Sequence, residues 1–190
     1  MSSNNGNTTG KLVVISGPSG SGKTTICQEL AKDPRVKKSI SVTTRPPRSQ
    51  EEDGKDYYFV GEREFDKKLK EGSFVEYARY SDNLYGTLLE PLESALDEGL
   101  VYLLEIDVRG ALQIMEKYPD AISIFILPPG EDVLEKRLAE RLTDEEPAIN
   151  ARLEIAKEEL SFSSRYRYRV VNDKLEDALN EIHNILGLEK

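Results

Sequence analysis

Gly17-Pro-Ser-Gly-Ser-Gly-Lys-Thr24, near the start of the chain, is the stretch that decides the fold. It fits the pattern G-x-x-x-x-G-K-[ST] at every position and follows the apolar run at residues 12–15. Residues 25–32 then have a helical pattern, so strand, glycine loop and helix come in the order of a phosphate-binding loop. The alternative is a glycine turn that only joins a strand to a helix, and the flanking elements argue against it.

This loop predicts a site for a nucleoside triphosphate with Mg²⁺. Its glycines let the backbone bend tightly, so that amide N–H groups and the start of a helix face an anion. Lys23 can reach the β- and γ-phosphates, and the Thr24 hydroxyl can ligate Mg²⁺. The predicted triphosphate-binding residues are Gly17, Pro18, Ser19, Gly20, Ser21, Gly22, Lys23, Thr24 and Thr25.

Composition limits the class of protein. The chain has 190 residues, of which 38% are hydrophobic and 32% charged, as expected for one soluble α/β unit. The formal net charge of −9 argues against binding to nucleic acid or to an anionic membrane, and no apolar run is long enough to span a bilayer. The single cysteine, Cys27, favours a cytoplasmic setting, and residues 1–9 read as a disordered tail. We expect a monomer or a simple homo-oligomer.

Apolar runs alternate with helical patterns, which predicts an α/β fold with a mostly parallel sheet flanked by helices. Strands are expected at 12–16, 101–106, 122–127 and 168–171, and helices at 131–141, 149–162 and 175–186. Residues 39–88 break this alternation with short strands, close turns and one helix at 63–70, which is typical of a small antiparallel sheet. The expected units are therefore a core at 10–38 and 89–190 and an insertion at 39–88.

The insertion contains groups that suit a phosphate monoester. Arg45 and Arg48 flank two prolines that hold the chain extended, and each arginine offers a rigid fork of donors. Tyr57 and Tyr85 add phenol hydroxyls from the same small sheet. The alternatives are a solvated basic loop and tyrosines that fill the core of the sheet.

Glu76 interrupts the otherwise apolar segment Phe74-Val-Glu-Tyr. If the insertion binds a nucleobase, a carboxylate there favours guanine, whose N1–H and 2-amino groups are adjacent donors, over adenine, which has an acceptor at N1. A side chain that faces solvent from an alternating strand is the alternative.

Glu105 and Asp107 follow the apolar strand at 101–104. An acid at the carboxyl end of a strand next to a phosphate loop supports Mg²⁺ directly or through water, and this is the role expected of Glu105. Asp107 could face the incoming substrate instead. A charged residue that simply leaves the sheet remains the alternative for Glu105.

Arg137, Arg141 and Arg152 can supply positive charge to transferring phosphates. The first two are four residues apart on one helix face, and the third lies on the next helix, so a helical hairpin could close over the nucleotide. Surface pairing with Glu140 or Glu145 is the alternative. His183 is the only histidine and lies far from every motif, so a histidine base is not expected.

Several segments together resemble the guanylate kinase family over residues 11–186. The segments are Gly17–Thr24, Ser41-Val-Thr-Thr-Arg-Pro-Pro-Arg48, Asp53-Gly-Lys-Asp-Tyr-Tyr-Phe59, Phe74-Val-Glu76, Tyr85-Gly-Thr87, Glu105-Ile-Asp107, Ile124-Phe-Ile-Leu-Pro-Pro129 and Val170-Val-Asn-Asp173. The arginine–proline segment and the Tyr-Gly-Thr turn are the most specific of them. The family pattern differs at Leu142, where glycine is usual, and at Leu84, where tyrosine is common.

The resemblance implies a P-loop kinase core, a mixed α/β GMP-binding subdomain at 39–88 and a helical lid at about 139–151. It implies transfer of the ATP γ-phosphoryl group to GMP, and to dGMP, with Mg²⁺. It places Ser41, Glu76, Thr87 and Asp107 at the guanine, Arg45, Arg48, Tyr57 and Tyr85 at the GMP phosphate, and Asn172 near the adenine of ATP. Lys23, Arg45, Arg137, Arg141 and Arg152 are the expected catalytic residues. Two alternatives stay open: a non-catalytic module that binds phosphopeptides, and a kinase that acts on a ribose bisphosphate.

Overall fold

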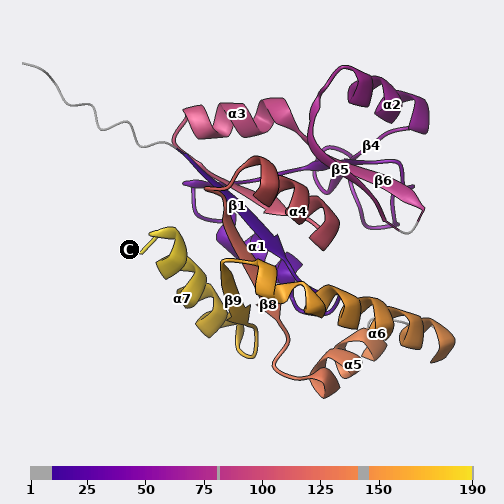
Figure 1. Cartoon of the computed structure of the whole chain (residues 1–190), viewed down its shortest axis with the longest axis vertical. Coiled ribbons are helices and arrows are strands. Elements are labelled where there is room, and N and C mark those ends of the chain that lie inside the picture. The colour runs from indigo at the N-terminus through magenta and orange to yellow at the C-terminus, as the bar shows by residue number, and fades with distance from the viewer. Residues whose placement is uncertain (1–9, 81, 141–145, 190) are drawn as a thin grey trace, which may run out of the picture.

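A parallel sheet of five strands forms the centre of the protein (Figure 1). The computed structural model describes residues 10–80, 82–140 and 146–189, with side chains given outside 139–152. The strands are β1 (Lys11–Ser16), β2 (Val36–Lys38), β7 (Val101–Glu105), β8 (Ile122–Leu127) and β9 (Tyr168–Val171), in the order β2-β7-β1-β8-β9. Every neighbouring pair in this large sheet is parallel, which confirms the predicted α/β class.

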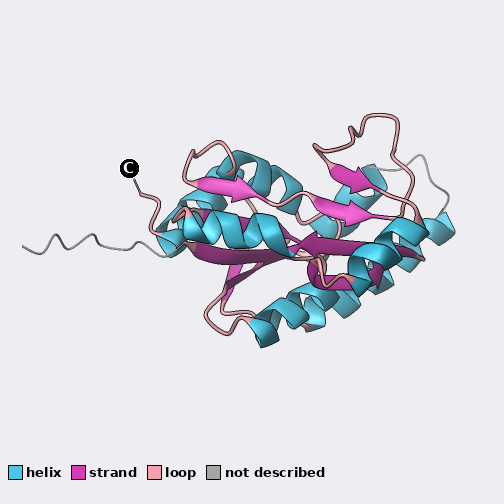
Figure 2. Ribbon diagram, turned by 90° about the horizontal axis from the view of Figure 1, so that it is seen from above, coloured by secondary structure: helices cyan, strands magenta, loops and turns pink. Residues whose placement is uncertain are grey.

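The central strands β1, β7 and β8 are mostly apolar because helices cover both faces of the large sheet. Val13 and Ile15 of β1 pack with α1 (Lys23–Leu30) and α7 (Leu175–Leu186). Leu12 and Val14, which alternate with them, pack with α3 (Leu89–Asp97) and α4 (Val108–Lys117) on the other face. Figure 2 shows the two helical layers on either side of the central strands. This packing holds the carboxyl ends of β1 and β7 in fixed positions at one edge of the sheet.

A second, smaller sheet has the order β4-β3-β6-β5 and carries α2 (Glu62–Lys70). Its strands are β3 (Ser41–Thr43), β4 (Tyr57–Phe59), β5 (Phe74–Tyr80) and β6 (Asn83–Leu88). The β3–β6 and β5–β6 pairs are antiparallel, whereas β3 and β4 are parallel. The prediction of a small antiparallel sheet is therefore right for the β3–β6 and β5–β6 pairs and wrong for the β3–β4 pair. The connection at residues 44–56, which contains Arg45-Pro-Pro-Arg48, returns the chain to the end of the sheet where β3 begins, so that β4 runs parallel to β3.

The chain leaves the large sheet after β2 and re-enters it at β7, the neighbouring strand. The insertion with its short strands was expected to begin at residue 39, and the structure divides the residues around this boundary between two sheets. Val36–Lys38 pairs with β7 in the large sheet, and Ser41–Thr43 pairs with β4 and β6 in the small one. The helix α3, which was not predicted, then leads back to the core. It has Pro91 in its first turn, where a missing N–H is tolerated.

Two further helices, α5 (Glu131–Glu140) and α6 (Glu146–Ser161), follow β8 and pack against each other. Leu134, Leu138 and Ala156 form the small cluster between them. A 3₁₀ turn, η1 (Ser163–Arg165), connects α6 to β9. Over the residues described, the longest apolar stretch of any helix falls short of what a bilayer crossing needs.

Candidate active site

The phosphate loop lies between β1 and α1, and its shape depends on glycine. Gly22 immediately precedes α1 with φ 89°, a left-handed conformation that L side chains rarely adopt. A Cβ at this position would also collide with the side-chain amide of Asn172. That amide donates a 2.7 Å hydrogen bond to the Ser21 carbonyl oxygen, so the residue directly after β9 holds the loop from the side. The N-cap residue Gly22 has no side chain that could accept from the first turn of α1, so the start of this helix can face an anion.

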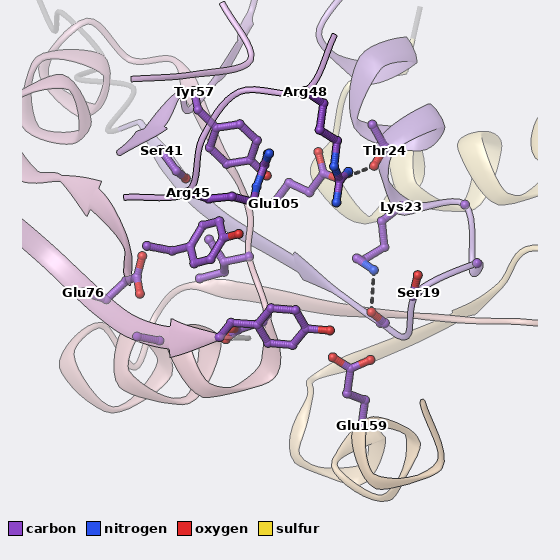
Figure 3. A pocket seen from close by; sticks show the side chains of 18 residues that line it. Ser19, Lys23, Thr24, Ser41, Arg45, Arg48, Tyr57, Glu76, Glu105 and Glu159 are labelled. Atoms are coloured by element: carbon purple, nitrogen blue, oxygen red, sulfur yellow. Dashed lines mark hydrogen bonds between the residues drawn. The ribbon is translucent and has the colours of Figure 1, made fainter. Parts of the chain in front are cut away.

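Lys23 is the first residue of α1, and its ammonium group lies over the loop. Lys23 Nζ donates to the carbonyl oxygens of Gly17 and Pro18 at 2.5 and 3.0 Å. Figure 3 shows this side chain beside the phosphate loop, with Thr24 and Arg48 above it and Glu159 below it. Its position at the loop places one positive charge where the phosphates of a triphosphate would lie.

The hydroxyl of Thr24 and the carboxylate of Glu105 meet at the carboxyl ends of β1 and β7. Thr24 Oγ1 donates to Glu105 Oε1 at 2.5 Å, and Lys38 Nζ lies 2.7 Å from Glu105 Oε2. A hydroxyl and a carboxylate are hard oxygen ligands of the kind that Mg²⁺ prefers, so this donor set fits the ion. The Lys38 contact was not predicted, because β2 was not recognised as a strand of the large sheet.

A single cavity of about 280 Å³ extends from the phosphate loop to the small sheet. Residues of the expected triphosphate site and residues of the expected acceptor site both line it. Its predicted members are Gly17, Ser19, Gly20, Gly22, Lys23, Thr24, Ser41, Arg45, Arg48, Tyr57, Glu76, Tyr85, Glu105 and Asp107. Residues as far apart in the chain as Gly17 and Asp107 therefore surround one space.

Arg45 is held in a fixed orientation by a carboxylate. Its Nη2 atom lies 2.8 and 2.9 Å from the two carboxylate oxygens of Glu51, which also accepts a hydrogen bond from the Arg48 amide at 2.8 Å. The guanidinium carbon of Arg45 lies 5.5 Å from the centroid of the Tyr57 ring, and Tyr57 packs edge-on against Tyr85. The Glu51 carboxylate raises the pKa of Arg45, and burial raises the pKa of Tyr57.

Glu76 lies at the far end of the cavity and is only 5% exposed. Its Oε1 atom accepts a 2.6 Å hydrogen bond from the Thr87 hydroxyl, which is wholly buried. Burial raises the pKa of Glu76 to about 7, with a further contribution from Asp107, while Thr87 opposes the shift. The structure thus excludes the alternative that Glu76 faces solvent. Thr87 itself lies behind Glu76 and does not line the cavity.

Asp107 combines a structural contact with a place at the cavity. It is the N-cap residue of α4, and its Oδ1 atom accepts from the Gly110 amide at 2.8 Å. The same residue lines the cavity near Glu76.

A second hollow lies on the other side of the phosphate loop. It is lined by Gly20, Gly22, Thr25, Arg137, Asn172, Asp173 and Leu175. The guanidinium of Arg137 lies 3.3 and 3.4 Å from the Asn172 carbonyl oxygen. Of the remaining predicted residues, Pro18 and Ser21 belong to the loop itself. Arg141 and the side chain of Arg152 lie outside the described residues, as do residues 142–145 and the other side chains of the expected lid.

Four residues that line the cavity were missed, namely Ala78, Tyr80, Ile106 and Glu159. The charged one among them is Glu159 of α6. Figure 3 shows its carboxylate directed at the loop, below Ser19 and Lys23. Burial raises its pKa, whereas Lys23 and the Ser19 amide lower it. A signal in the sequence could have revealed this residue. Glu159 lies three residues after the buried Ala156, on the apolar stripe of α6, where a charged side chain is unusual.

This arrangement is typical of one class of enzyme. A parallel sheet with a phosphate loop, a lysine over that loop and a cavity that continues to arginine and tyrosine donors defines a P-loop kinase with a phosphorylated acceptor. The comparisons with known proteins narrow the class.

The guanylate kinase family model matches residues 9–189. The guanylate kinase of Clostridium tetani is 46% identical over 181 residues, which cover 95% of this chain and 87% of that protein. The crystal structure of guanylate kinase from Anaplasma phagocytophilum has a TM-score of 0.80 at 36% identity and covers 95% of this chain and 86% of its own. A shikimate kinase from Bacteroides thetaiotaomicron shares the fold alone, with a TM-score of 0.50 at 12% identity over 93% and 98% of the two chains. The chain belongs to the guanylate kinase family and is a kinase.

Proposed function

We propose that this protein binds ATP at the phosphate loop and GMP against the small sheet, and transfers the γ-phosphoryl group from one to the other. The acceptor oxygen of the GMP phosphate forms a bond to the γ-phosphorus as the bond to the β,γ-bridging oxygen breaks. The products are ADP and GDP. The observation that carries this proposal is the single cavity, which has the loop at one end and the Glu76 carboxylate at the other.

The acceptor needs no general base. The second pKa of a phosphate monoester is about 6, so the attacking oxygen is already mostly ionised at neutral pH. The protein's task is then to align the two phosphates and neutralise their charge, which Lys23, Arg45 and Arg48 are placed to do. Arg137 lies on the opposite side of the loop and would act on the ATP side.

The base is recognised by the carboxylate of Glu76. In its ionised form it accepts hydrogen bonds from the N1–H and 2-amino groups of guanine, while Thr87 fixes one of its oxygens. Ser41 lines the same end of the cavity and Asp107 lies beside it. We accordingly assign residues 39–88 as the GMP-binding subdomain and 10–38 with 89–190 as the core.

Mg²⁺ is proposed as the metal that accompanies ATP. Thr24 and Glu105, the latter through water, would hold it at the carboxyl ends of β1 and β7. When bound, the ion supplies charge that stabilises the phosphate oxygens. The single buried cysteine, Cys27, remains the basis for expecting a cytoplasmic setting.

Asn172 contributes to the ATP site mainly through the loop. Its side-chain amide is already bonded to Ser21, and its carbonyl oxygen faces Arg137. We therefore assign it a supporting position between the loop and the second hollow, where the adenine would lie.

The proposal is tested by offering GMP, dGMP, AMP and a ribose bisphosphate separately to the purified chain with MgATP, and by measuring ADP release. We expect fast ADP release with GMP, slower release with AMP, and almost none without an acceptor. Release at the same rate with and without GMP would contradict the proposal. A ribose bisphosphate as the best acceptor would favour the alternative kinase, and binding of nucleotides with no ADP release would favour the non-catalytic module.

A further inference from the structure

Gly110 lies in the first turn of α4, where nothing about the backbone calls for glycine. It is the third residue after the N-cap Asp107, whose carboxylate accepts its amide N–H, and its φ is not positive. Glycine is the poorest helix former after proline, so an alanine would favour this helix. The presence of glycine therefore has to be explained by what surrounds it.

One side chain occupies the space that a methyl group would need. A Cβ built on Gly110 lies 2.6 Å from Glu76 Oε2 and 3.2 Å from Glu76 Cδ. The next atom, Ile106 Cδ1, is 3.6 Å away, which is an ordinary van der Waals distance. A side chain at position 110 would thus displace the Glu76 carboxylate and disturb almost nothing else.

Glu76 cannot avoid such a methyl group by moving its strand. The side chain of Gln113 on α4 donates a 2.8 Å hydrogen bond to the Tyr77 carbonyl oxygen of β5, which ties the strand to the helix one residue after Glu76. Thr87 holds the other carboxylate oxygen at 2.6 Å from the neighbouring strand. The conformational freedom that remains is in the side-chain torsions of Glu76.

We propose that Gly110 is a positioning residue for base recognition: its lack of a side chain lets the Glu76 carboxylate lie against α4, at the depth where it can accept hydrogen bonds from a guanine. The proposal rests on the function proposed above for Glu76. It also explains how the core and the small sheet together form the acceptor site, since α4 belongs to the first and β5 to the second.

The direct test is Gly110→Ala, assayed with GMP and with AMP at saturating MgATP. We expect KM for GMP to rise at least about fivefold, the lower end for a mispaired buried group. KM for ATP and for AMP should stay unchanged. The melting temperature should be unchanged or higher by about 2–4 °C, because alanine favours the helix. A matched control is Gly61→Ala, where no atom lies within 4 Å of the added methyl group and GMP kinetics should not change.

A double variant decides whether the effect acts through Glu76. In a Glu76→Ala background the carboxylate is gone, so adding Gly110→Ala should not raise KM for GMP further. If Gly110→Ala alone fails to fold because of its clash with Glu76, the double variant, which lacks that carboxylate, should still fold. An equal rise in both backgrounds, or an unchanged KM for GMP in Gly110→Ala, would overturn the proposal. If the unaltered chain fails to phosphorylate GMP, the proposed function fails instead, which is a separate outcome.

Discussion

The phosphate loop and the acceptor wall of the same cavity are built in different ways. The loop presents backbone amides, and its position is fixed by the large sheet and by the Asn172 bond to Ser21. The acceptor wall, by which we mean Arg45, Arg48, Tyr57, Glu76 and Tyr85, presents side chains. These are held by side-chain contacts, such as that of Arg45 with Glu51 and that of Glu76 with Thr87.

The supporting structures differ as well. The large sheet is packed on both faces by extensive clusters, whereas the described core of the small sheet consists of Val42, Phe65 and Phe74 with a few partly buried neighbours. Binding a phosphate group therefore depends mostly on backbone shape. Choosing the base depends on individual side chains, where a single atom can change the outcome.

Lys23→Ala gives the largest effect expected from this comparison. The ammonium group neutralises charge that grows during transfer, and loss of one such preorganised contact lowers kcat by about 10²–10³-fold. GMP binding, measured by calorimetry, should be unchanged because the acceptor wall is untouched. If kcat were near normal, the loop would not depend on this charge.

Glu76→Gln alters the acceptor wall alone. The amide keeps the size of the side chain but replaces one acceptor oxygen with an NH₂ donor. This donor would then face the N1–H or 2-amino donor of guanine, so that no hydrogen bond forms there. We expect kcat/KM for GMP to fall about 5- to 150-fold, corresponding to about 1–3 kcal/mol for a mispaired buried group. ATP affinity and turnover of AMP should change little. An equal loss for GMP and AMP would show that Glu76 only supports the fold.

The pKa of Glu76 makes the two halves of the site respond differently to pH. Burial raises this pKa to about 7, and the form that accepts hydrogen bonds from guanine is the ionised one. GMP affinity should therefore rise from pH 6 to 8, with a slope that approaches about tenfold per pH unit below the pKa. The phosphate of GMP titrates near pH 6 as well. Glu76→Gln provides the control: it should lose the part of the dependence that belongs to the carboxyl group.

Asn172→Ala is expected to have the smallest effect, on the donor side. It removes the hydrogen bond that holds the Ser21 carbonyl oxygen, worth about 0.5–1.5 kcal/mol, so ATP affinity should fall about 2- to 12-fold. GMP affinity should not change. A loss of GMP affinity of similar size would mean that the loop and the acceptor wall are not supported independently.

The difference between a loop defined by its backbone and a wall made of side chains also explains what could be predicted from the sequence. The glycine pattern defines the loop because backbone geometry restricts which residues can occupy it. The strands of the large sheet were found from their apolar runs, and Tyr168–Val171 and Ile122–Leu127 have the predicted bounds. Glu76 stood out only as a polar residue in an apolar strand, and its burial depends on a helix more than thirty residues further along the chain.

The elements that were missed depend on tertiary contacts. Val36–Lys38 has two lysines and too few apolar residues to be recognised, and it is a strand because β7 pairs with it. The helix α3 contains Pro91, which argues locally against a helix. Glu159 interrupts the apolar stripe of α6, which the sequence shows, but the packing of α6 decides that its carboxylate reaches the loop.

The small sheet is inserted in the chain between β2 and β7, which are neighbours in the large sheet, and this has a consequence for how such enzymes diversify. Because the chain departs from Val36–Lys38 and returns on the adjacent strand, with Val36 opposite Val101, the segment between them can be replaced without changing the pairing of any core strand. Closing a longer or shorter loop between fixed ends costs little, since that free energy grows only with the logarithm of loop length. Evolution can therefore keep the ATP-binding core unchanged and replace the acceptor-binding segment as a unit. The condition is that position 110 leaves room for the side chain that the new segment packs against α4.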